Sequence, residues 1–148
     1  MKAKKIFAFE GASSHDIRDG VLDLDDYKSK NDMLRDYNRQ TRAGEMLRIN
    51  HVSWWKEELP NEEEMERGIK NLKTYNFKVD YVLAHSLPQH VVKTLYGRNT
   101  DSDIATEYFQ KLETAGFGYK RFFCGHYHKD MDLPPKYSIR YRCIERIL

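Results

Sequence analysis

The stretch RFFCGHYHKD, residues 121–130, decides which fold is predicted, because it joins a buried strand to side chains that can bind a ligand. Residues 122–124 are apolar and bulky, and a short apolar run closed by a glycine is typical of a fully buried strand. Two histidines follow with one residue between them, His126 and His128. The sequence therefore predicts a strand that delivers imidazoles to the edge of a sheet.

A second run, KVDYVLAHSLP at residues 78–88, has the same design upstream. Residues 79–84 are predicted to form a buried strand that ends at His85, and Pro88 stops it. Two separate strands thus finish in histidine.

Helical patterns alternate with these strands. Residues 58–77 predict a helix with Asn61 as N-cap, acidic residues in its first turn and basic residues later, as the helix dipole favours. Residues 100–118 predict a second helix, capped by Asp101 or Ser102.

The rest of the chain completes an α/β or mixed α+β pattern. A short strand is expected within residues 4–10, another within 46–55, and a strand with one covered face over 136–148, where apolar and polar residues alternate. Residues 16–44 are polar and predict a short helix or an irregular excursion. We expect a single domain over residues 1–148.

Composition excludes several classes of function. Hydrophobic residues make up 40% of the chain, enough for a core, and the net charge of +2 provides no basic excess for nucleic acid. No apolar run is long enough for a signal peptide or a membrane helix, so a cytoplasmic location with no membrane partner is expected. Cys124 and Cys143 lie in apolar, strand-like surroundings and are predicted to be buried thiols.

The three strand-end histidines, His85, His126 and His128, are the candidate metal ligands. In open α/β sheets ligands bind beyond the carboxyl ends of the strands, and neutral imidazole is a good ligand for first-row transition metals. The alternative is that these are structural histidines, because a histidine at a strand end and an HxH pair are weak patterns by themselves. His15, His51 and His90 have no such setting and are expected to be structural or exposed.

Four stretches together resemble the calcineurin-like metallophosphoesterase superfamily, in particular its small bacterial and phage-type members. They are FAFEGASSHDI, VSWWKEELPNEEEMERGIKNL, VDYVLAHSLP and FFCGHYH, and they occur in the family's order. The GHxH motif corresponds to residues 125–128, and the strand-end histidine followed by proline corresponds to His85 and Pro88. The resemblance covers nearly the whole chain.

The resemblance implies a four-layer α/β/β/α sandwich and a hydrolase with a two-metal centre. By analogy, His85 and His126 would ligate one ion and His128 the other, with manganese, iron, zinc or nickel as the metals. Such a site holds a phosphoester across both ions while a bridging hydroxide attacks phosphorus. The family uses no protein nucleophile, so no catalytic side chain is assigned, and Tyr127 receives no role.

The family's DxH, GDxxD and GNH motifs are absent from this sequence. Those motifs supply the remaining ligands, so the chain resembles only the C-terminal half of a metallophosphoesterase. Two divalent ions close together repel each other strongly, and bridging carboxylates usually offset this repulsion. Three neutral imidazoles bring no negative charge that could do so. The acids nearest the motifs are Asp80, Asp130 and Asp132, none at a place the family uses for ligands. We expect an incomplete metal site.

Half of a sandwich should leave a sheet face uncovered, which predicts association with a complementary N-terminal half or with a second copy. The same set of motifs would be found if this sequence were a truncated phosphatase that lacks the N-terminal half. Two functions remain open: a partial metal-dependent phosphoesterase acting on a phosphoester substrate, and a catalytically inactive phosphoesterase-like interaction module.

Overall fold

A computed structural model describes residues 3–100 and 102–147. The chain forms two compact units, a larger one from Met1–Ala12 with Leu59–Leu148 and a smaller one from Ser13–Glu58. The single domain expected over residues 1–148 stays a prediction.

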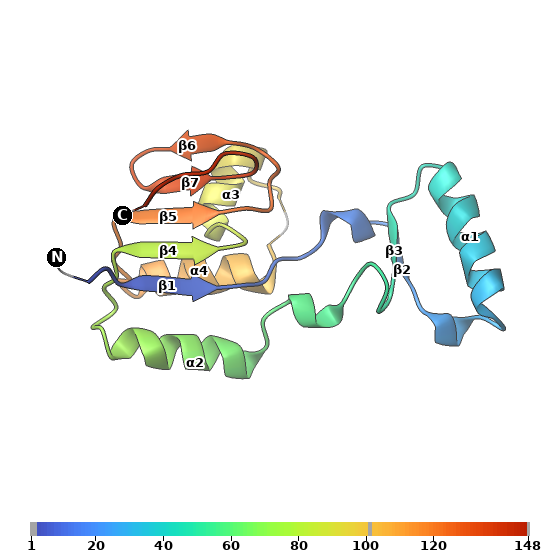
Figure 1. Ribbon diagram of the computed structural model, residues 1–148, viewed down its shortest axis with the longest axis horizontal. Helices are drawn as coiled ribbons and strands as arrows, with labels where there is room; N and C mark the ends of the chain where they lie inside the picture. The colour runs from blue at the N-terminus through green and yellow to red at the C-terminus, as the bar shows by residue number, and fades with distance from the viewer. Residues whose placement is uncertain (1–2, 101, 148) are drawn as a thin grey trace. The chain divides into compact units, whose positions relative to one another are not determined.

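The larger unit is built on a mixed sheet (Figure 1). In the described part of the chain this sheet has five strands in the order β1-β4-β5-β7-β6, and only the edge strand β6 is antiparallel to its neighbour. The strands are β1 (Ile6–Phe9), β4 (Tyr81–Ala84), β5 (Arg121–Cys124), β6 (Met131–Leu133) and β7 (Tyr137–Ile139). The α/β class expected from the sequence is confirmed.

Helices α2 (Glu62–Lys73), α3 (Gln89–Tyr96) and α4 (Ile104–Thr114) contribute to one hydrophobic cluster with the sheet. One face of the strands joins their apolar side chains in a single core, to which the sheet contributes Phe7, Val82, Phe122, Tyr137 and Ile139. Figure 1 shows α3 and α4 behind the strands. The opposite face is less covered: Ile6 is 45% exposed, and Tyr81 and Leu83 are partly exposed.

The helix caps show where local sequence was sufficient. Asn61 begins α2 as predicted, in a capping box with Glu64. The N-cap of α4 is Asp103, not Ser102, because the Asp103 carboxylate accepts the Thr106 N–H in a capping box. The alternative cap Asp101 lies outside the described residues.

Helix α3 was not predicted from the sequence. Pro88 does end the β4 segment, but it also serves as the N-cap of α3, where its missing N–H costs nothing. Gly97 ends the helix with a φ of 101°, a conformation that glycine adopts without strain.

The C-terminal strand is shorter than predicted. Only Tyr137–Ile139 form β7, and all three side chains are buried rather than alternating. The guanidinium group of Arg140 then donates hydrogen bonds to the carboxylates of Asp132 and Glu145, and the chain leaves the sheet. The expectation of one covered face over residues 136–148 was therefore wrong.

Two polar clusters tie the sheet together. At the amino ends of the strands, Asp80 accepts the Lys5 N–H at 3.0 Å and pairs with Lys120 at 2.6 Å, and these contacts, the Lys120 one foremost, lower the pKa of Asp80 to about 2. At the end of α4, Glu113 accepts hydrogen bonds from Lys136 (2.8 Å), Tyr137 (2.8 Å) and Tyr119.

The smaller unit is a β-α-β crossover within residues 13–58. Strands β2 (Gly20–Leu22) and β3 (Leu47–Ile49) pair in parallel, and α1 (Lys30–Arg42) connects them. Met33, Leu47 and Ile49 are buried in this unit. The polar stretch over residues 16–44 thus contains a helix, one of the two alternatives expected.

The two cysteines differ. Cys124 is buried as predicted, but Cys143 is exposed, because the chain has left the sheet before it reaches that residue. Both thiols are free. None of the helices in the described ranges has the length and apolar character that crossing a bilayer requires.

Candidate metal site

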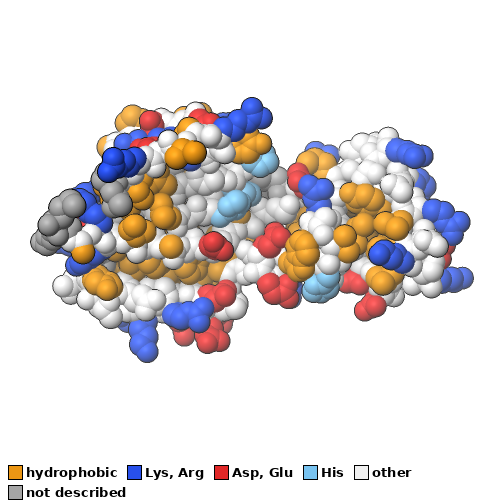
Figure 2. Space-filling view, viewed as in Figure 1, with side chains coloured by type: hydrophobic (Ala, Val, Ile, Leu, Met, Phe, Trp, Pro, Cys, Tyr) orange, Lys and Arg blue, Asp and Glu red, His pale blue; other side chains and the backbone are white. Residues whose placement is uncertain are grey.

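The structure brings His85 and His126 together at the carboxyl edge of the sheet. Strands β4 and β5 are neighbours in parallel register, with Ala84 opposite Cys124, so the residues that follow them emerge side by side. The two imidazole ring centroids are 5.0 Å apart with 64° between the ring planes. Figure 2 shows histidine side chains on the face of the molecule turned to the viewer.

Two residues after β5 have a backbone conformation that is strained for residues with a Cβ. His126 and His128 have φ angles of 65° and 49°, in the left-handed region that residues with a Cβ rarely adopt. The Tyr127 N–H donates to the Gly125 carbonyl at 2.8 Å and closes a tight turn around His126. Strain of this kind is concentrated at functional sites.

Gly125 leaves room beside the His85 ring. A Cβ on Gly125 would lie 3.6 Å from Nδ1 and 3.8 Å from Cε1 of His85. The glycine therefore keeps this edge of the imidazole free of a methyl group.

His128, the third predicted ligand, has a different environment. Its exposed ring stacks on Tyr141, with centroids 5.0 Å apart and 28° between the planes. Within residues 3–100 and 102–147, no group of three or more His, Cys, Asp or Glu side chains is arranged to hold a metal ion. The structure thus places two of the three histidines as a pair.

The acids nearest to the motifs have other contacts. Asp130 accepts the backbone N–H groups of residues 141–143, and hydrogen bonds from this segment, that of the Cys143 thiol foremost, hold its pKa well below the ordinary value. Asp132 bonds to Arg140, Ser138 and Arg121, which lower its pKa to about 2. Asp80 lies at the opposite end of the sheet.

Tyr127, between the two histidines, was not identified from the sequence. Its buried hydroxyl accepts the Leu87 N–H at 3.3 Å, and its ring stacks on Tyr96 at 5.7 Å and meets the His126 ring edge-on at 5.1 Å. Burial raises the pKa of the Tyr127 hydroxyl, which therefore stays protonated. The sequence signal that could have indicated this place is the alternation of side chains along the segment. If the histidines on either side face the edge of the sheet, Tyr127 faces the core.

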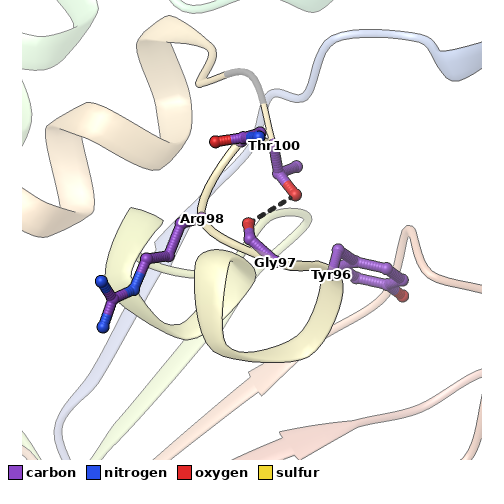
Figure 3. Close-up of a pocket in the computed structure, with 5 residues that line it drawn as sticks. Tyr96, Gly97, Arg98 and Thr100 are labelled. Carbon is purple, nitrogen blue, oxygen red and sulfur yellow. Dashed lines mark hydrogen bonds between the residues drawn. The ribbon is translucent and has the colours of Figure 1, made fainter.

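Two further features lie near the pair. The Ser86 hydroxyl, directly after His85, is fully buried and has no hydrogen-bond partner in the described part of the chain, which is uncommon in folded proteins. A shallow hollow of about 380 Å³ is lined by residues 96–100, and Figure 3 shows Arg98 and Tyr96 pointing away from each other across it. Tyr96 thus connects this hollow to the ring of Tyr127.

No family model, no curated protein and no solved structure matches this chain. The chemistry available to this chain depends on its own residues. Those residues offer two imidazoles on a rigid sheet edge.

Proposed function

We propose that this chain carries the histidine side of a metal-dependent phosphoesterase site, with His85 and His126 as ligands of one divalent transition-metal ion. The observation that carries the proposal is the pairing of their imidazoles, 5.0 Å apart, on two neighbouring parallel strands. Two neutral imidazoles suit manganese, iron, zinc or nickel. A bound ion would polarise a phosphoryl oxygen and lower the pKa of its water.

The residues present fit one ion better than two. The imidazoles are neutral ligands, and the nearby carboxylates of Asp130 and Asp132 are held by other groups. His128 would join the site only by leaving its stacking contact with Tyr141. Further anionic ligands would have to come from another polypeptide segment.

The uncovered side of the sheet supports the larger architecture. In the α/β/β/α sandwich that we propose, a second sheet would cover Ile6, Tyr81 and Leu83, which are partly or largely exposed. A complementary N-terminal half or a second copy would supply it. The N-terminal half would also complete the metal site with carboxylates.

A second candidate is an interaction module that keeps the fold without the chemistry. It is favoured by the lack, among the described side chains, of a group of three metal-binding residues. In that case the exposed apolar face would be the functional surface.

Cobalt(II) titration followed by visible absorption tests the metal proposal. His85→Ala and His126→Asn should each lose binding, and asparagine is chosen at residue 126 because it tolerates the left-handed backbone. The matched control is His51→Asn, since His51 also has a positive φ, 53°, but lies in the smaller unit. Binding that survives both site substitutions would refute the proposal.

Hydrolysis of bis-p-nitrophenyl phosphate with manganese separates the two functions. Turnover that His126→Asn abolishes would support the phosphoesterase. Cobalt binding that depends on both histidines, without turnover, would support the partial site, whereas a chain that neither binds metal nor hydrolyses the diester would favour the interaction module. Two tightly held ions per chain, measured by elemental analysis, would contradict the incomplete site.

A further inference from the structure

We infer that Tyr127 is a positioning residue that couples the two histidine-bearing loops and so sets the separation between His85 and His126. The inference rests on the proposed function for its purpose, but the coupling itself can be measured without a metal. Tyr127 contacts neither the ion nor a substrate in this proposal. It acts through the two imidazoles.

First, a hydrogen bond joins the loop after β4 to the loop after β5. The hydroxyl of Tyr127 accepts the N–H of Leu87, 40 residues away in sequence and two residues after His85. The β4–β5 pairing stops at Ala84 and Cys124, so this bond joins the two segments beyond the sheet. Leu87 is fully buried, and its N–H would lose its acceptor if the hydroxyl were removed.

The second step is the packing of the ring. Tyr127 is only 9% exposed; Tyr96 stacks on it, and His126 meets it edge-on, with ring planes 81° apart. Lys129 lies over the Tyr96 ring, 4.7 Å from its centroid. The phenol is therefore fixed in position and direction, and a rotation of the His126 ring would have to displace it.

The third step concerns the backbone. His126 and His128 both have positive φ angles, a costly conformation that persists only where the surroundings enforce it. Tyr127 lies between them and has its side chain anchored in the core. The anchored phenol thus holds the turn in the conformation that presents His126 to His85.

Imidazole NMR spectra of the full chain test the coupling directly. Tyr127→Phe keeps the ring but removes the acceptor of the Leu87 N–H. We expect the side-chain resonances of both His85 and His126 to shift, and the Leu87 amide to exchange faster with solvent. The matched control is Tyr108→Phe, which removes another largely buried hydroxyl, the donor to the Met65 carbonyl, and should leave both histidines unchanged.

Cobalt(II) affinity gives the functional readout. Tyr127→Phe should weaken binding about tenfold, the scale of losing a group that orients a metal ligand, with unchanged binding in Tyr108→Phe. If Tyr127→Phe does not fold, Tyr96→Leu, which removes the stacking partner and keeps the hydroxyl, should shift the same two histidines.

The outcomes separate the inference from the proposed function. If the His85 resonances do not move in Tyr127→Phe, the coupling is overturned, whatever the metal result. If Tyr127→Phe does not fold, unmoved His85 resonances in Tyr96→Leu overturn it in the same way. A wild-type chain that binds no cobalt refutes the proposed function, while a shift of the His85 resonances would still establish the coupling.

Discussion

Gly68, in the middle of α2, occupies a position where a methyl group has no space. A Cβ at this residue would overlap the Tyr108 hydroxyl and lie 3.4 Å from Phe7 Cζ and from Phe9 Cε2. The Tyr108 ring is 4% exposed, and its hydroxyl donates to the Met65 carbonyl at 3.0 Å. We therefore predict that Gly68→Ala, normally a stabilising change in a helix, destabilises this protein.

The magnitude follows from three contributions. Replacing a helical glycine by alanine gains about 1 kcal/mol. Overpacking a well-filled core costs about 1–3 kcal/mol, and displacing the Tyr108 hydroxyl from Met65 costs about 1 kcal/mol more. The net loss in the free energy of unfolding should be about 1–3 kcal/mol.

A double-mutant cycle measured by urea unfolding tests this reasoning. In the Tyr108→Phe background the overlapping oxygen is gone, and the atoms nearest to the new methyl group are then at least 3.4 Å away. Gly68→Ala should then be neutral or stabilising by up to about 1 kcal/mol. The coupling between the two substitutions should exceed about 1 kcal/mol, as for residues in contact. If Gly68→Ala stabilises both backgrounds equally, the close contact of α2 with Tyr108 of α4 is refuted.

Three further predictions concern titration, the site and the thiols. Burial raises the pKa of Glu113, but its hydrogen-bond donors lower that pKa by more, so the carboxylate should stabilise the fold above about pH 4.5 and lose this effect as the pH falls. In Glu113→Gln the free energy of unfolding, followed by circular dichroism, should therefore depend less steeply on pH in the acid range. Equal pH slopes in the two proteins would contradict this. Gly125→Ala should weaken cobalt binding, because its methyl group would lie 3.6 Å from Nδ1 of His85, while the thermal unfolding midpoint changes little. Unchanged affinity would argue against an ion near Nδ1. Ellman's reagent should modify Cys143 in the native protein and Cys124 only after unfolding, since burial raises the pKa of the Cys124 thiol to about 12; rapid modification of both would show that β5 opens.

The parts of the fold that were predicted correctly depend on local signals. The Asn61 cap of α2 and the two strands that end in histidine are each specified within about ten residues of sequence. The meeting of His85 with His126 followed from a general rule, that neighbouring parallel strands end at the same edge.

The parts that were missed depend on contacts between distant segments. Helix α3 was overlooked because Pro88 both ends one segment and begins the next. The role of Tyr127 depends on a partner 40 residues away, which no local pattern specifies. The early end of β7 depends on the bonds of Arg140 to Asp132 and Glu145.

The carboxylate of Asp80 has a consequence for how this sheet could change. By bonding to Lys5 and Lys120 it locks three adjacent strands at the end remote from the histidines. Their alignment is thus secured without help from the opposite loops. Insertions or substitutions in those loops could give the molecule a new ligand while its framework stays in place.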